Sequence, residues 1–297
     1  MDDLESLRRQ IHSTETLRSV VRTMKILSMT SIHQCEDAVA SLADYDRTVR
    51  LGLQVAMRHR PREATLPTSG GRRIGAVVFG LAWGLCGRFN QQIASYTQEQ
   101  LADELPENIQ MLALGELVGG RLEDVGHFPD RLLRAPDAVE QITPCVQDLL
   151  VEVERWRMEE QIQEVLLFYN ETTSMTAFAP TRQQLLPLDH RWLAQLEEQS
   201  WPTRMLPIFR MDWAPLFAAL VREYLFISLY RAFAESLASE HSSRLAAMQV
   251  AQDNAEERLD DLQRRFHRRR QSAITEELLD IAAGAEAVAT DPVPRDS

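Results

Sequence analysis

The sequence predicts an α/β domain inserted between two long terminal helices that pair as an antiparallel coiled coil. Two observations carry this prediction. Apolar residues recur with a heptad spacing near both ends of the chain, and short apolar runs alternate with helical patterns in the middle. The predicted boundaries are residues 1–57 for the N-terminal coiled-coil helix, 74–209 for the α/β domain and 212–289 for the C-terminal coiled-coil helix.

The C-terminal helix is predicted by a stripe of residues at alternating steps of three and four. The stripe consists of Leu245, Met248, Gln252, Ala255, Leu259, Leu262 and Phe266. This spacing keeps one face toward a partner helix. No proline follows Pro215 until residue 292, and Asp212 is a suitable N-cap. A helix of this length would span roughly 110 Å, so it needs a second helix to bury its stripe.

The partner is expected at the N-terminus, where residues 1–57 contain no proline and one glycine, Gly52. The expected stripe consists of Leu4, Leu7, Ile11, Leu17, Val20, Val21, Met24 and Leu27, followed by Ala38, Leu42, Tyr45, Val49 and Gly52. Long helices at the two termini, with a domain between them, favour an intramolecular antiparallel pair.

The middle section reads as a Rossmann-like α/β domain with a mainly parallel sheet, because apolar runs and helical patterns alternate. The expected strands are Ile74–Phe79, Ile109–Leu114, a short Val125–Phe128, Gln163–Tyr169 and an antiparallel Thr181–Leu188. The expected helices are Arg88–Leu105 and Asp137–Glu159, and Asp189–Pro207 is expected to be a polar connector.

A glycine-rich turn follows the first expected strand, at Gly80, Gly84 and Gly87. It matches neither the G-x-G-x-x-G pattern nor a Walker loop, and no lysine follows to reach a phosphate. The sequence therefore favours a tight strand-to-helix turn over a nucleotide site, and no cofactor is expected.

Composition excludes several classes of function. The formal net charge of -12 over 297 residues argues against a general nucleic-acid binder. Cys35, Cys86 and Cys145 are far apart and form no CxxC pair, and His241 and His267 have no ligand at metal spacing. We therefore expect no metal site and, because no catalytic motif occurs, no catalytic residues. No signal peptide is expected, and the apolar run 216–230 carries two charges, so we expect no membrane span.

Two motifs near the C-terminus resemble the gamma subunits of F-type ATP synthases. Residues 235–248 read ESLASEHSSRLAAM, and residues 270–287 read RQSAITEELLDIAAGAEA. They are similar to the family's ESLASEHAARMVAM and RQAAITKELLEIVAGAEA, at the family's separation. The resemblance extends to Met24-Lys25 and to Gly84-Leu-Cys-Gly87, although the family's usual Asp-Arg before that turn is Ala82-Trp83 here.

The resemblance implies a central rotor shaft, not an enzyme in itself. Such a shaft couples ion flow through a membrane ring of c-subunits to conformational change in the catalytic beta subunits. It implies alpha, beta and epsilon subunits and the c-ring as partners, no nucleic acid, and membrane contact only through those partners. The implied location is peripheral, on the cytoplasmic face of the bacterial inner membrane, with a proton or sodium as the coupled ion.

The resemblance also implies a set of subunit-contact residues. By position these are Met24, Lys25, Glu240, Arg244, Arg270, Gln271, Thr275 and Glu277 along the shaft, with Cys86 and Arg88 at a lower contact. The densest basic run, Arg264–Arg270, suits acidic loops on a protein partner, although a solvated helix face is an equal reading from composition alone.

Two other readings stay open. A non-rotary coiled-coil adaptor, or a central stalk of the V-type kind, also uses long paired helices, although a V-type stalk lacks an α/β insert. A Rossmann oxidoreductase is the third reading, and it requires that the chain bind a nucleotide.

Overall fold

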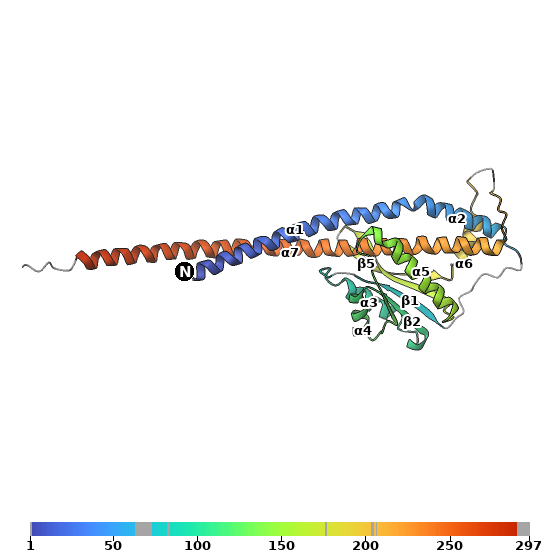
Figure 1. Ribbon diagram of the computed structural model, residues 1–297, viewed down its shortest axis with the longest axis horizontal. Coiled ribbons are helices and arrows are strands. Elements are labelled where there is room, and N and C mark those ends of the chain that lie inside the picture. Colours follow the sequence, from blue (N-terminus) through green and yellow to red (C-terminus); the bar gives the residue numbers. More distant parts are fainter. Residues whose placement is uncertain are drawn as a thin grey trace, which may run out of the picture. The chain divides into compact units, whose positions relative to one another are not determined.

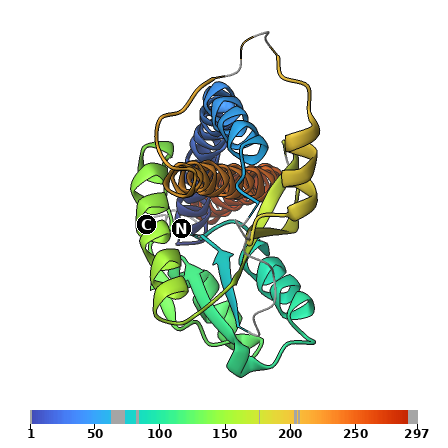
Figure 2. The same cartoon turned by 90° about the vertical axis from the view of Figure 1, so that its right-hand side faces the viewer.

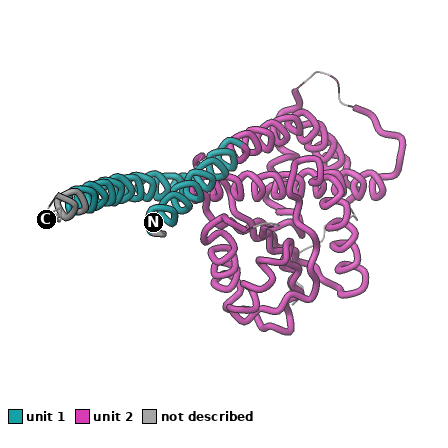
Figure 3. Tube along the Cα trace, turned by 60° about the vertical axis from the view of Figure 1, so that its left-hand side comes forward, with its two compact units in different colours: residues 1–26, 248–297 teal, residues 27–247 magenta. Residues whose placement is uncertain are grey.

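The computed structural model describes residues 2–62, 73–81, 84–175, 177–202, 205 and 207–289. The chain divides into two compact units, one formed by residues 1–26 with 248–297 and the other by residues 27–247 (Figure 3). Two long helices, α1 (Asp2–Ser41) and α7 (Trp213–Ala289), contribute to both units. The expected fold class, long terminal helices with an inserted α/β domain, is confirmed.

The first unit is an antiparallel helix pair. Three contacts give its direction, because residues 3, 8 and 25 of α1 lie against residues 269, 266 and 249 of α7. On α7 the predicted stripe is the inner face. Met248, Ala255, Leu259 and Leu262 are buried, and Gln252 and Phe266 are half-buried.

The predicted stripe of α1 is confirmed at Leu4, Leu7, Ile11, Val21 and Met24, which are buried or half-buried, but not throughout. Leu17, Val20 and Leu27 are 55%, 50% and 61% exposed, so their assignment to the buried stripe was wrong. Steps of three and four from Leu4 instead lead through Thr14, Val21 and Lys25, which are half-buried or buried. The seam of α1 therefore mixes polar with apolar side chains, and the predicted stripe departs from it at Leu17, Val20 and Leu27.

The expected single helix over 1–57 is interrupted at one residue. α1 ends at Ser41, and α2 begins at Ala43 and ends at Arg58. Around Leu42 the backbone makes a tighter hydrogen bond, from Leu42 N–H to the Val39 carbonyl at 3.2 Å. Such a turn has the three-residue spacing that often separates two helical segments.

The second unit contains a five-stranded sheet in the order β3-β2-β1-β4-β5. The strands are β1 (Ile74–Phe79), β2 (Ile109–Leu114), β3 (Arg131–Leu133), β4 (Glu164–Ser174) and β5 (Ala177–Leu186). The first four are parallel, and β5 pairs antiparallel with β4. Helices α3 (Phe89–Gln100), α4 (Glu116–Asp124) and α5 (Ile142–Met158) connect the strands (Figure 1).

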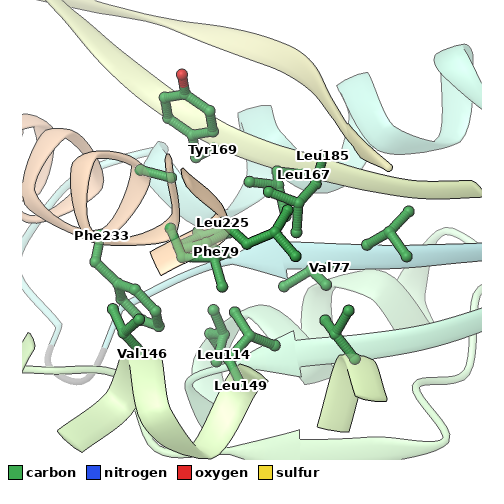
Figure 4. Close-up of a cluster of buried hydrophobic side chains, with 14 of the residues drawn as sticks. Val77, Phe79, Leu114, Val146, Leu149, Leu167, Tyr169, Leu185, Leu225 and Phe233 are labelled. Atoms are coloured by element: carbon green, nitrogen blue, oxygen red, sulfur yellow. The ribbon is translucent and has the colours of Figure 1, made fainter. Parts of the chain in front are cut away.

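Alternate residues of the central strands face two separate cores. Val77 and Phe79 of β1 pack with residues of α5 and α7, including Val146 and Phe233 (Figure 4). Ala76 and its alternate neighbours pack with α3 and α4 on the opposite face. Figure 2 shows α5 and α3 on opposite sides of the sheet. The unit is thus a three-layer α/β domain, with α7 forming part of one outer layer.

Several predicted elements need correction. Residues 125–128 are not a strand, because His127 N–H bonds the Leu122 carbonyl at 2.9 Å as α4 ends, and the third strand is β3 instead. The predicted polar connector contains α6 (His190–Glu198), whose Leu193 and Leu196 are buried. The helix expected over 88–105 ends at Gln100. The helix expected from Asp137 begins at Ile142, with Pro144 in its first turn, where a missing N–H is tolerated.

Candidate functional site

The predicted contact residues at the start of the shaft lie in the helix pair of the first unit. Met24 and Lys25 are both half-buried. Lys25 Nζ donates to the side-chain oxygens of Gln249 and Gln252 on α7, the latter at 2.9 Å. A single polar group at a coiled-coil seam fixes the register of the two helices. Lys25 therefore has a structural partner set within the chain.

The predicted contact residues near the end of α7 lie beyond the last charge pair with α1. Arg269 Nε lies 3.3 Å from the Asp3 carboxylate, close to the N-terminal end of α1. The contact residues that follow, Arg270, Gln271, Thr275 and Glu277, are all exposed. Thr275 Oγ1 donates to the Gln271 carbonyl at 2.9 Å, so these two residues sit one turn apart. This segment presents polar side chains to any partner outside the chain.

The same segment exposes large apolar side chains. Ile274, Leu278 and Ile281 are 48%, 61% and 64% exposed and follow steps of four and three, which place them on one face of the helix. On α1, Leu17 and Val20 are also exposed, as is Val250 on α7. Exposed apolar stripes of this kind mark surfaces that another protein covers. The sequence analysis assigned Leu17 and Val20 to the internal seam, whereas the structure exposes both.

Glu240 and Arg244 lie in the second unit, and Glu240 is in its interior. The Glu240 carboxylate is 3% exposed and accepts a hydrogen bond from Arg244 Nη2. Arg244 Nη1 donates to His241 Nδ1 at 3.1 Å, which leaves the proton of neutral His241 on Nε2. That nitrogen is buried without a hydrogen-bond partner in the described part of the chain.

Burial controls the titration of this cluster. Desolvation raises the pKa of Glu240, and the Arg244 guanidinium acts in the opposite direction. Desolvation, with Arg244 as a second cause, lowers the pKa of His241 to about 4. The geometry therefore favours a neutral His241 beside a charged Arg244, and the two charged groups Glu240 and Arg244 satisfy each other.

The glycine-rich turn packs against the same part of α7. Ser243 Oγ donates to the Cys86 carbonyl at 2.7 Å, and Cys86 is 2% exposed. Burial raises the pKa of the Cys86 thiol to about 12, although Arg244 opposes this. Arg88 is exposed, and so is Leu85, which has a φ of 67°. The turn therefore presents Leu85 and Arg88 outward and keeps Cys86 inside, while Ala82 and Trp83 lie outside the described residues.

The predicted contact residues thus fall in three places. The first is the Lys25 contact in the helix pair, the second is the exposed segment after Arg269, and the third is the Cys86–Arg244 cluster in the second unit. Leu85 was missed by sequence reasoning, since a positive φ at a leucine leaves no pattern in the sequence.

The described residues offer neither a metal site nor a membrane-spanning helix. They hold no group of three or more His, Cys, Asp or Glu side chains placed to bind a metal ion. Among the described helices, none has a stretch long and apolar enough to cross a bilayer.

Two long terminal helices that pair with each other define, with the Rossmann-like domain between them, a class of proteins in which an α/β domain is inserted into an antiparallel helix pair. The family model described as ATP synthase matches residues 3–288, and the chain belongs to that family. This match confirms the resemblance that the two C-terminal motifs indicated.

Curated relatives named ATP synthase gamma chain match over nearly their whole length. The protein from Bacteroides fragilis is 28% identical over 301 residues, covering 97% of this chain and 100% of the relative. The protein from Thiobacillus denitrificans is 26% identical over 289 residues, covering 96% of this chain and 99% of the relative.

Solved structures share the fold. The rotor of the Euglena gracilis mitochondrial ATP synthase, in rotational state 1, matches with a TM-score of 0.61 and 14% identity, covering 92% of this chain and 99% of that chain. The central stalk and c-ring structure from Tetrahymena thermophila matches with a TM-score of 0.54 and 18% identity, covering 78% of this chain and 99% of that chain.

Proposed function

We propose that this chain is the central rotor shaft, the gamma subunit, of a rotary F-type ATP synthase. The observation that carries the proposal is the segment of α7 after Arg269, which has an exposed polar face and an exposed apolar stripe. Near-complete alignment with relatives named ATP synthase gamma chain supports the same role. The chain itself is non-catalytic in this proposal and is one part of an ion-transporting ATP synthase.

The mechanism follows from unequal contacts around the shaft. An apolar stripe and a polar face on one helix present different surfaces to subunits that surround it. If each catalytic subunit meets a different face, each is held in a different conformation, and rotation changes its affinity for ADP, phosphate and ATP. Such coupling requires only that one partner bind several states with different affinities.

The proposed partners are the alpha and beta subunits around the helices and the epsilon subunit and c-ring near the α/β domain. In this assignment residues 1–57 and 212–289 form the shaft, and residues 74–209 form the inserted domain. The complex sits at the bacterial inner membrane with this subunit peripheral, on the cytoplasmic face, and in contact with lipid only through its partners. The matched solved structures, a rotor and a central stalk with its c-ring, support this arrangement.

We propose two groups of contact residues, one that touches the partner subunits and one that supports those contacts from inside the chain. Arg270, Gln271, Thr275 and Glu277 are exposed and are proposed to contact the catalytic subunits, and Arg88 is exposed in the same way at the glycine-rich turn. Met24, Lys25, Cys86, Glu240 and Arg244 are half-buried or buried, and we propose that they support these contacts by holding the helices and the turn in place.

Purification of the assembled complex tests the proposal. An affinity tag on this chain should bring down alpha, beta and epsilon subunits and the c-ring, and the isolated complex should hydrolyse ATP while the free chain does not. Co-purification with V-type subunits would favour the V-type stalk. Recovery without ATPase subunits would favour the coiled-coil adaptor, and nucleotide binding by the free chain would revive the oxidoreductase alternative.

A further inference from the structure

A cavity in the second unit lies apart from every residue assigned above. Its volume is about 510 Å³, and its walls come from α2, from α6 and the residues after it as far as Pro202, and from Arg231 of α7. This volume falls in the range of sites that bind small molecules, roughly 300–1,000 Å³. The cavity therefore has room for a ligand of metabolite size.

Most of the charged residues in the cavity wall are cationic. Arg47, Arg50 and Arg231 line it, and Asp46 is the single acidic residue among its lining residues. Arg50 Nε donates to Asp46 Oδ2 at 2.8 Å, and Arg231 Nη2 lies 3.7 Å from the same oxygen. Arg47 is exposed and has no ion pair with any described residue. Arg50 and Arg231 thus share one carboxylate oxygen, so their guanidinium groups keep N–H donors that can bind an anion.

The other carboxylate oxygen of Asp46 is a buried hydrogen-bond acceptor without a donor in the described part of the chain. Asp46 is 9% exposed, and its Oδ1 is buried with no hydrogen-bond partner among the described residues. A buried acceptor without a donor is costly, so a ligand that brings a donor would be favoured. Asp46 lines the cavity, so its carboxylate lies within reach of a ligand held there. The cavity therefore favours a ligand that carries a hydroxyl group as well as an anionic group.

Aromatic packing holds one of the arginines in position. The Trp192 ring lies 4.7 Å from the Tyr224 ring, and the Arg50 guanidinium lies 5.8 Å from the centre of the Trp192 ring. Leu51 and Leu196 provide apolar wall beside them. A guanidinium fixed by an aromatic ring and a carboxylate loses less freedom when it binds an anion.

We propose that the cavity between α2, α6 and α7 binds a hydroxyl-bearing phosphate ester, with its phosphate on Arg47, Arg50 and Arg231 and a hydroxyl donating to Asp46. A phosphate offers three acceptor oxygens to several guanidinium groups, which a carboxylate does not. Two sources carry this chemistry, namely a soluble metabolite and the glycerol phosphate headgroup of a lipid. The bound ester would bridge α2 and α7, a role separate from the rotor function proposed above.

Calorimetric titration of the purified full chain with glycerol 3-phosphate tests the proposal. Arg47→Gln is the decisive variant, because Arg47 is exposed and has no ion-pair partner to lose. Arg121→Gln is the matched control, since Arg121 is exposed on α4 and pairs with Asp124 at 2.9 Å, outside the cavity. Loss of one charged hydrogen bond should weaken binding roughly tenfold to a hundredfold in Arg47→Gln and leave Arg121→Gln unchanged.

Further probes resolve the chemistry and its source. We expect glycerol 3-phosphate to bind more tightly than inorganic phosphate, and Asp46→Asn to reduce that preference. Vesicles of phosphatidylglycerol, compared with phosphatidylcholine, distinguish a lipid headgroup from a soluble ester, and binding in either arm supports the shared chemistry. Equal affinity of the two arginine variants, equal affinity for glycerate, or no binding of any phosphate probe at millimolar concentration would overturn the proposal.

Discussion

The Asp3 carboxylate lies 3.3 Å from Nε of Arg269, and this pair joins the first turn of α1 to α7. α7 continues from that pair to Ala289. The residues directly after Arg269 are exposed, whereas the inner face before it is buried against α1. Arg269 therefore divides α7 into two parts. The part before it packs against α1, and the part after it is available to partners.

Arg270→Ala should lower ATP synthesis and ATP-driven pumping while the complex still assembles. A guanidinium paired with a carboxylate of a catalytic subunit forms charge-assisted hydrogen bonds. Removal of one side of such a contact costs about 2–5 kcal/mol where the contact is buried. Synthesis by reconstituted vesicles, at matched complex content and driving force, measures the effect.

Arg121→Ala is the control for this variant, because Arg121 pairs locally with Asp124 at 2.9 Å on α4, outside the basic run of α7. It should leave synthesis close to that of the parent. Equal rates for the parent and Arg270→Ala would show that Arg270 is only a solvated residue.

The register of the helix pair predicts a disulfide crosslink. Val21 and Ala255 are both buried in the first unit, with Lys25 bonded to Gln252 one turn away. Double variants that place cysteine at position 21 and at 252 or 255 should crosslink within one chain under mild oxidation, as judged by a mobility shift without a dimer band. Crosslinks that form only between molecules would contradict the intramolecular pair.

The buried histidine predicts a loss of stability in acid. Because the pKa of His241 falls from 6.5 to about 4 on folding, the unfolded chain binds its proton first as the pH is lowered. The contribution is fully present above pH 6.5 and is lost as the pH falls toward 4, by roughly 3 kcal/mol. Chemical denaturation at several pH values measures it.

His241→Asn should flatten this dependence relative to the parent, whatever its effect on absolute stability. Glu240 remains in both proteins, and its raised pKa acts in the opposite sense, so the comparison cancels it. An unchanged slope in His241→Asn would show that His241 is not the titrating group.

The glycine-rich turn allows a matched pair of substitutions. A Cβ on Gly80 would lie 2.2 Å from the Cβ of Val118, whereas a Cβ on Gly84 would meet nothing within 4 Å. Overpacking typically costs about 1–3 kcal/mol, so Gly80→Ala should lower the free energy of unfolding by that amount. Gly84→Ala should change it by only about 0.5 kcal/mol. Equal effects of the two changes would contradict the packing of β1 against α4.

Sequence reasoning succeeded where the buried positions carry apolar residues in a recognisable run or stripe. Strands Ile74–Phe79 and Ile109–Leu114 were predicted with the bounds that the structure has, because both are continuous apolar runs in a covered parallel sheet. The stripe of α7 was also predicted, since its seam is mostly apolar. The seam of α1 was predicted only in part. Leu4, Leu7, Ile11, Val21 and Met24 are buried or half-buried as expected, but Thr14, Lys25 and Ser28 also occupy such positions, and an apolar pattern does not mark them.

Short elements and tertiary contacts escaped prediction for other reasons. β3 has only three residues, two of them exposed, so no apolar run marks it. α6 buries two leucines in an otherwise polar sequence, although Asp189 at its start accepts a hydrogen bond from Arg191 N–H at 2.8 Å and was a usable signal. The interior position of Glu240 depends on elements distant in sequence, which no local spacing reveals.

Lys25 and its hydrogen bonds make the contact between α1 and α7 accessible to chemical labelling. Lys25 is the only lysine in the sequence, so an amine-selective reagent has one side chain to modify besides the α-amino group. Its ammonium group is occupied by Gln249 and Gln252 as long as α1 and α7 stay together. The labelling rate at that single position therefore reports how often the amine leaves these two glutamines, in the free chain or during turnover of an assembled complex.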